Sequence, residues 1–191
     1  NSFDNPAAHG DVVENLRRIR EEIGDAARLS GRAPDAVRLI GVTKTVEPAR
    51  INAALDAGLR EIGENRVQEL LGKRDSLHLD GVQTHLIGHL QTNKVKAALP
   101  AVDMIQSIDS VRLARTVSDQ AVGAGRVLDV LLEVNIGGED SKSGVDPRAL
   151  DELMDAALAM PGIRLRGLMT VPPILDTERE RRAIFSRMHK L

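Results

Sequence analysis

A lysine stands at the end of an apolar run near the start of this chain. Residues 39–42 are apolar and predict a buried strand, and Lys44 follows two positions later. We expect a lysine beside a buried strand to lose hydration, which favours the neutral, nucleophilic amine. Such an amine forms a Schiff base with an aldehyde or a ketone. Two structural alternatives remain open: Lys44 pairs with a carboxylate such as Glu64, or it extends its ammonium group into water.

A glycine-rich segment, GGEDSKSG at Gly137–Gly144, comes after another predicted strand. It resembles a phosphate-binding loop, but Ser141 precedes Lys142 where the GxxxxGK[ST] pattern requires glycine. An ordinary turn before a helix is the better interpretation. Lys142 and Ser143 could still meet an anion there.

The segment HLIGH places His85 and His89 four residues apart. This spacing makes a metal-ligand pair on a helix, whereas the segment is predicted to run from a strand into a turn. Leu86 also stands where the HExxH motif has its glutamate. We therefore predict no metal site.

The elements that position these residues alternate along the chain. Apolar residues at helical spacing predict an amphipathic helix at about residues 11–28. Six strands with helical segments between them follow, at Val37–Val42, Glu61–Ile62, Thr84–Ile87, Met104–Ile108, Val127–Ile136 and Leu165–Val171.

Helix starts are marked by capping residues and prolines. Pro48 opens the helix that Gly58 follows, and Asp109 is predicted to cap the helix at Ser110–Val122. Asp146 and Pro147 supply a cap and a first-turn proline. Thr177 and Glu180 match a capping box for the last helix, which runs to the final residue.

Strands that alternate with helices predict an α/β fold with parallel strands, either a doubly wound open sheet or a barrel. Each predicted strand ends in polar residues, and in a barrel all of the strand ends converge on one mouth. These residues are Thr43-Lys44, Glu64-Asn65, His85 with His89, Gln106-Ser107, Asn135 and Met169-Thr170. The pattern favours a TIM-type (β/α)8 barrel with an extra N-terminal helix, of which about six βα units are present.

The composition is that of an ordinary globular protein, with 42% hydrophobic and 28% charged residues over 191 positions. A net charge of −2 shows no nucleic-acid footprint. The sequence has no cysteine and no apolar run of the roughly 18–20 residues that a membrane span needs. We expect a cytoplasmic protein that binds neither nucleic acid nor membranes.

Six segments occur in the order typical of one family: GVTKTVEP, GENRVQE, HLIGHLQTNK, SIDS, VNIGGEDSKSGV and LRGLMTVPP, between about Val37 and Pro173. Together they resemble the pyridoxal 5′-phosphate (PLP) homeostasis proteins of the YggS/PROSC type. These proteins in turn resemble the N-terminal barrel of alanine racemase.

The resemblance implies a PLP-binding barrel in which Lys44 of GVTK holds the cofactor as a Schiff base. By the same resemblance, four further residues are expected to bind the cofactor. Asn65 of GEN, His85 of HLIGHLQ and Met169 of RGLM match positions that line the pocket, and Lys142 of SKSG matches a second lysine near its mouth. The family is regarded as carrying PLP and limiting the free aldehyde, with no established turnover.

The chain departs from the family pattern at three places. Arg66 stands where a tyrosine is common, and Val46 stands where a second lysine is frequent. The family's serine-containing GMS motif and its VRIG-T-like strand and turn are not found. We therefore expect residues 1–191 to form a single PLP-binding barrel domain that lacks its C-terminal strands and phosphate-binding segment.

Two enzyme functions are alternatives to a PLP carrier. A PLP-dependent amino-acid racemase would use Lys44 as one base, but the second base is usually a tyrosine and the sequence contains none. An aldolase-like barrel would form its Schiff base with a sugar or a keto acid, which leaves HLIGHLQTNK and SKSG unexplained. We expect a monomeric carrier rather than an enzyme, with PLP and PLP-dependent apoenzymes as its partners.

Overall fold

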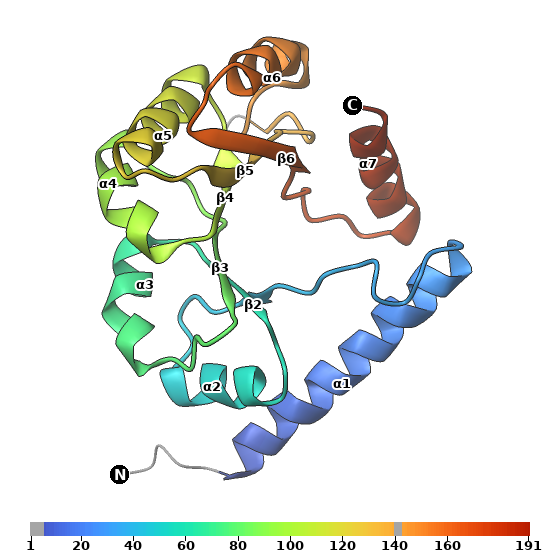
Figure 1. Ribbon diagram of the computed structural model, residues 1–191. Coiled ribbons are helices and arrows are strands. Elements are labelled where there is room, and N and C mark those ends of the chain that lie inside the picture. The colour runs from blue at the N-terminus through green and yellow to red at the C-terminus, as the bar shows by residue number, and fades with distance from the viewer. Residues whose placement is uncertain (1–5, 140–142) are drawn as a thin grey trace. The chain divides into compact units, whose positions relative to one another are not determined.

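The computed structural model describes residues 6–139 and 143–191, in which helices and strands alternate along the chain (Figure 1). The chain divides into two compact units. The first comprises residues up to 64 together with 68–84, and the second comprises residues 65–67 and 85–191.

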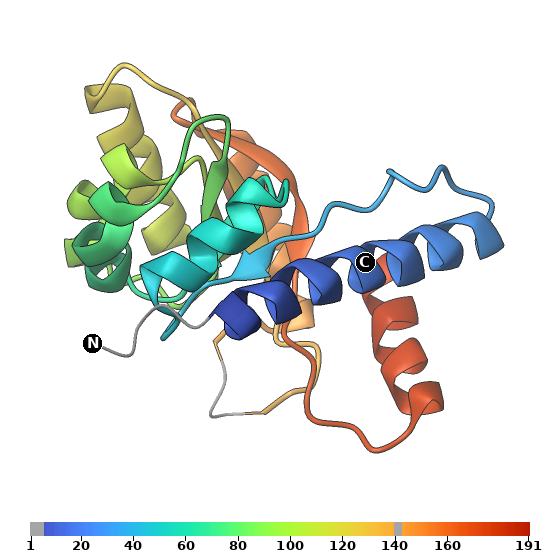
Figure 2. The same cartoon turned by 90° about the horizontal axis from the view of Figure 1, so that it is seen from below.

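The first unit opens with a long helix, α1 (Pro6–Leu29), which lies beside α2 (Pro48–Asp56) (Figure 2). Strand β1 (Gly41–Val42) pairs in parallel with β2 (Glu61–Glu64). Most of α3 (Val67–Lys73) and a short 3-10 turn, η1 (Arg74–Ser76), complete the unit.

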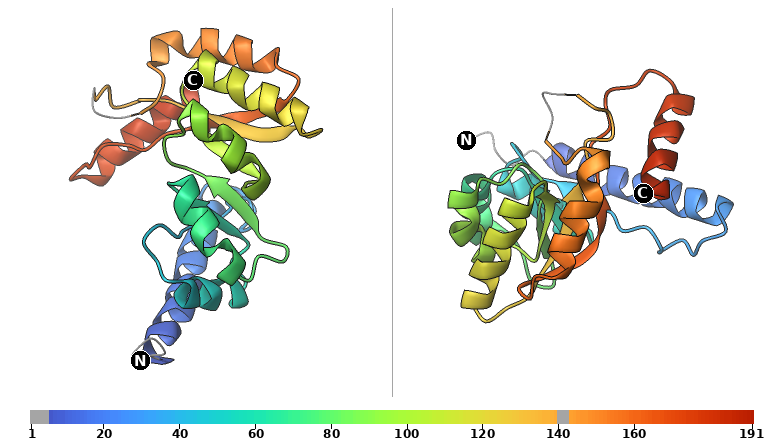
Figure 3. Two further views of the ribbon diagram at one scale, coloured as in Figure 1. Left: turned by 90° about the vertical axis from the view of Figure 1, so that its left-hand side faces the viewer. Right: turned by 90° about the horizontal axis from the view of Figure 1, so that it is seen from above.

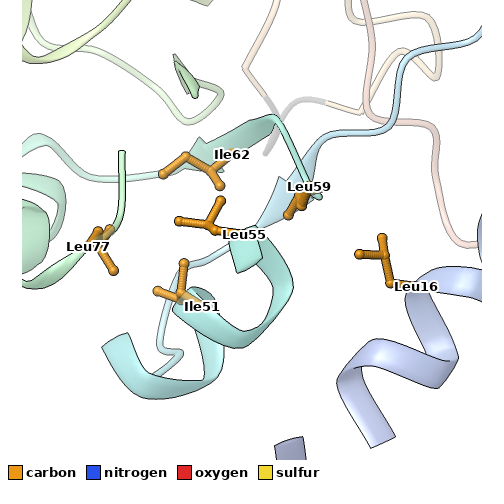
Figure 4. Close-up of a cluster of buried hydrophobic side chains, with 6 residues drawn as sticks. All are labelled: Leu16, Ile51, Leu55, Leu59, Ile62 and Leu77. Atoms are coloured by element: carbon orange, nitrogen blue, oxygen red, sulfur yellow. The ribbon is translucent and has the colours of Figure 1, made fainter. Parts of the chain in front are cut away.

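Six aliphatic side chains from α1, α2, β2 and the segments beside them form the core of the first unit, as Figure 4 shows. They are Leu16, Ile51, Leu55, Leu59, Ile62 and Leu77. Ile51 and Leu55 lie four residues apart on one face of α2, the spacing that directs helix side chains to the same side. This cluster holds β1 and β2 against the two helices and so fixes the strand end that precedes Lys44.

Strand β3 (Gln83–Leu86) begins in the first unit, where the Gln83 amide donates to the Arg60 carbonyl over 2.8 Å. From His85 on, the chain belongs to the second unit, in which each strand pairs in parallel with the next. The remaining elements of that unit are η2 (Thr92–Lys94), α4 (Val95–Ala98), η3 (Leu99–Ala101), β4 (Met104–Ile108), α5 (Val111–Gly123), β5 (Leu128–Glu133), η4 (Pro147–Ala149), α6 (Leu150–Leu158), β6 (Ile163–Met169) and α7 (Glu178–Lys190).

Helices α5 and α6 pack side by side and contact β6 (Figure 3). Leu113, Val117 and Ala121 recur at helical spacing on α5 and are buried. All five residues of β4 are buried as well. The core of the second unit therefore lies between these helices and the parallel strands.

The predicted helix starts are confirmed with one exception. Asp146 caps the turn before α6 by accepting from the Arg148 amide over 2.8 Å, and Thr177 and Glu180 form the capping box of α7. The predicted Asp109 cap is wrong, because the hydroxyl of Ser110 accepts from the Leu113 amide instead.

All six predicted strands exist, and five of them have shifted boundaries. Strand β4 has the predicted bounds, whereas β1 covers only Gly41–Val42 of the predicted Val37–Val42. Leu39 is half-buried and packs against the core cluster, so its apolar character reflects packing outside the strand. In the described part of the chain, no helix has the length and apolar composition that a membrane span requires.

Candidate functional site

Lys44 follows β1 and is exposed. The predicted loss of hydration is therefore wrong: the flanking strand is only two residues long and leaves the side chain in solvent. Within residues 6–139 and 143–191, no hydrogen bond or ion pair engages Lys44 Nζ. An accessible amine without a competing carboxylate is what reaction with an aldehyde needs.

Glu64, the carboxylate considered as a partner of Lys44, pairs with Lys73 instead. The carboxylate is completely buried, and the lysine is 8% exposed. The Thr43 hydroxyl also donates to Glu64 Oε1 over 2.6 Å. A buried charge is stable only when it is paired and hydrogen-bonded, and this pair meets that condition behind the end of β1.

Two bonds from α3 reach the backbone on either side of Lys44. Lys73 Nζ donates to the Thr43 carbonyl over 2.7 Å, and the Thr45 amide donates to Glu69 Oε1 over 2.5 Å. Glu69 also lies 3.1 Å from Lys73 Nζ. The peptide groups that flank Lys44 are thus tied to one helix.

Lys73 was not singled out in the sequence analysis. A signal for its burial was present, because Leu70, Lys73 and Leu77 follow one another at spacings of three and four residues. Leu70 and Leu77 are both buried, so Lys73 falls on the apolar side of this segment.

In the second unit, Asn65 lies against the turn that follows β3. A Cβ atom at Gly88 would stand 2.4 Å from the Asn65 carbonyl oxygen and 2.7 Å from its Cα. Glycine is therefore required for the close approach of these two backbones. This contact fixes the position of Asn65 relative to the end of β3.

The two histidines of HLIGH lie in different environments. His85 is buried, and its Nδ1 lies 3.0 Å from Gln106 Nε2 of β4, while the exposed His89 lies 3.3 Å from the carboxylate of Asp109. No group of three possible metal ligands occurs in the described parts of the chain. The two side chains therefore do not act as a pair.

Met169 ends β6 and is half-buried. It pairs in register with Glu133 at the end of β5, and its carbonyl accepts from the Val134 amide over 2.8 Å. The strand end predicted to line a pocket is thus held by regular sheet bonds.

The segment after β5 is organised by Asn135. Its side-chain amide donates to the Glu139 carbonyl over 2.9 Å, and its Oδ1 accepts from the Glu139 amide over 3.2 Å. After the gap in the described residues, Gly144 adopts a φ of 110° close to the Asn135 backbone. Lys142 lies outside the described residues, so its predicted role stays a prediction.

Burial and the neighbouring Asp109 raise the pKa of Glu133 above its ordinary value of 4.5, and His89 acts in the opposite direction. Because the folded protein then holds a proton that the unfolded chain releases, stability falls as the pH rises through the window that begins near 4.5. We expect Glu133→Gln to gain stability relative to the wild type as the pH rises above about 4.5.

Urea unfolding at several pH values measures this gain, with Glu152→Gln at an exposed position of α6 as the control. A difference between Glu133→Gln and the wild type that stays constant with pH would contradict the assignment.

The residues predicted to bind a cofactor are divided between the units. Lys44 belongs to the first unit, and Asn65, His85 and Met169 belong to the second. Asn65 follows β2, His85 is the next-to-last residue of β3, and Met169 ends β6. Sequence reasoning missed Lys73 and Glu69 beside Lys44.

Comparison with known proteins identifies the family of the chain. The family model for the alanine racemase N-terminal domain matches residues 14–191. A pyridoxal phosphate homeostasis protein from Aquifex aeolicus is 41% identical over 180 residues, which cover 94% of this chain and 79% of that protein.

Solved structures show the same fold. An unknown protein from Bifidobacterium adolescentis has a TM-score of 0.92 at 38% identity and covers all of this chain and 81% of its own. PipY from Synechococcus elongatus with PLP bound has a TM-score of 0.76 at 34% identity, over 88% of this chain and 79% of its own. Alanine racemase from Clostridium difficile, at 13% identity and a TM-score of 0.70 over 98% of this chain and 46% of its own, shares the fold alone. The prediction of an alanine racemase-like α/β barrel is confirmed.

Proposed function

Because the chain belongs to the pyridoxal phosphate homeostasis proteins, whose fold is that of the alanine racemase N-terminal domain, we propose that it binds PLP through a Schiff base with Lys44 and carries it without turnover. PLP-dependent apoenzymes are the proposed recipients of the cofactor. The aldehyde of PLP supplies the electrophile, and the chain supplies the amine and its surroundings.

One observation carries this proposal: Lys44 presents an exposed amine on a backbone that is held on both sides. The donor set fits the aldehyde end of PLP, since a primary amine must be accessible and not engaged by a carboxylate. PLP in the related PipY structure supports the choice of ligand. Asn65, His85, Met169 and Lys142 are proposed to line the pocket.

The absorbance spectrum of the purified protein with added PLP tests the proposal. We expect a yellow band near roughly 420 nm, where Schiff bases of PLP with lysine absorb. Lys44→Ala should abolish the band, because it removes the only atom proposed to bond to the aldehyde. Reduction with borohydride followed by peptide mass spectrometry should place the pyridoxyl group on Lys44.

Lys96→Ala is the matched control, since Lys96 is also exposed and belongs to α4 rather than to a strand end. It should keep the wild-type band. A wild type that stays colourless with PLP, or label on Lys96 in place of Lys44, would contradict the proposal.

The shared fold with alanine racemase makes racemisation the competing function. Incubating the PLP-loaded protein with alanine in deuterated water measures exchange of the α-proton. We expect no exchange at turnover rates, and rapid exchange that Lys44→Ala removes would establish the racemase instead.

A further inference from the structure

We infer that Glu69 and Lys73 of α3 are positioning residues for the Lys44 amine. They hold the two peptide groups that flank Lys44 and so fix the direction in which its side chain leaves the strand end. The inference rests on the proposed function, since it concerns the amine that would bond to PLP.

We call the contacts of Glu69 and Lys73 with these two peptide groups the clamp. The first half of the clamp acts on Thr43. Lys73 Nζ donates to the Thr43 carbonyl over 2.7 Å, and the Thr43 hydroxyl donates to Glu64 Oε1 over 2.6 Å. Lys73 and Glu64 are both buried and paired with each other. Hydrogen bonds to charged groups are stronger than those between neutral groups, and burial protects these from competing water.

The second half acts on Thr45, whose amide donates to Glu69 Oε1 over 2.5 Å. Thr45 has a φ of 58°, in the left-handed region that β-branched side chains rarely adopt, and is the only non-glycine residue with positive φ among those the structure describes. Such a conformation persists only where the surroundings impose it. The bond to Glu69 imposes it directly after Lys44.

Both halves come from one helix. Glu69 and Lys73 are four residues apart, so they lie on the same side of α3, and their side chains are 3.1 Å apart. Leu70, which is completely buried, anchors α3 between them. The clamp therefore transmits the position of a packed helix to the backbone around an exposed lysine.

Glu69→Ala tests the inference, because the side chain is partly exposed and its removal leaves the buried Lys73–Glu64 pair in place. Glu69→Gln keeps an acceptor for the Thr45 amide and serves as the conservative variant. Gln68→Ala, at an exposed neighbouring position of the same helix, is the matched control.

Two measurements distinguish a loss of the backbone contact from a loss of reactivity at the Lys44 amine. Hydrogen exchange of the Thr45 amide in the protein without PLP reports on the clamp, and the rate of growth of the band near roughly 420 nm after mixing with PLP reports on the amine. We expect Glu69→Ala to speed exchange by roughly 10-fold and to slow Schiff-base formation by about 10- to 100-fold. Glu69→Gln should restore both rates, and Gln68→Ala should change neither.

A Glu69→Ala variant with faster exchange but a wild-type rate of reaction with PLP would overturn the positioning role and leave the proposed function intact. Unchanged exchange of the Thr45 amide would overturn the clamp itself. If the wild type forms no Schiff base, the proposed function and the positioning role both fail, whereas the exchange rates still show whether Glu69 holds Thr45.

Discussion

Replacing Lys73 with methionine is expected to lower the free energy of unfolding by about 3–5 kcal/mol, the usual cost of removing one partner from a buried ion pair. Glu64 is completely buried, and loss of Lys73 would leave its carboxylate without a counter-charge. Methionine keeps a similar length, so the loss is mainly electrostatic. Urea unfolding, with both the midpoint and the slope fitted, measures it.

The double variant Lys73→Met/Glu64→Gln separates charge from shape. The glutamine can still accept from the Thr43 hydroxyl, and no charge remains buried, so we expect most of the lost stability to return. Lys96→Met, at an exposed lysine, should change the free energy of unfolding by less than about 0.5 kcal/mol. A double variant as unstable as the single one would show that the ion pair is not the cause.

Replacing Gly88 with alanine is expected to lower the free energy of unfolding by about 2–3 kcal/mol, in the upper part of the range for overpacking. The new Cβ atom would lie 2.4 Å from the Asn65 carbonyl oxygen, and all of the nearest atoms belong to the backbone. A backbone cannot rotate away as a flexible side chain can, so Asn65 or the turn after β3 must move. Urea unfolding measures the loss, and amide chemical shifts of residues 65–67 should report the displacement.

Gly123→Ala is the matched control. Gly123 ends α5 with a negative φ, and a Cβ atom there would meet no atom within 4 Å. Alanine is a better helix former than glycine, so we expect this variant to be equal to the wild type or more stable by up to about 1 kcal/mol. If Gly88→Ala were as stable as Gly123→Ala, the close contact with Asn65 would not constrain the fold.

Local sequence patterns were sufficient for most of the fold. The period of the apolar residues predicted six strands and the helices between them, because that period follows from backbone geometry alone. The capping box of Thr177 and Glu180 was equally predictable, since both partners lie within one helical turn. The sequence did not show that Ser110 rather than Asp109 caps α5. Asp109 contacts His89, which is 20 positions earlier in the chain, and no local pattern predicts that contact.

The candidate site was predicted in part. The sequence placed Lys44 at a strand end, and the family motifs made it the amine proposed to hold PLP. The predicted loss of hydration at Lys44 was wrong, and the burial of Lys73 was not predicted. The apolar run before Lys44 indicated a longer buried strand than the one that forms.

The sequence by itself determined the order of the elements, the α/β class and the position of Lys44 after β1. Only the tertiary structure decided which lysine is buried and which is free. Lys73 is buried because Thr43 and Glu64, which lie on earlier elements of the chain, supply an acceptor and a counter-charge for its ammonium group. The spacing of Leu70, Lys73 and Leu77 indicated only an apolar side of the segment, because burial of a charge depends on partners that folding brings together. Once buried, Lys73 holds the backbone that presents Lys44.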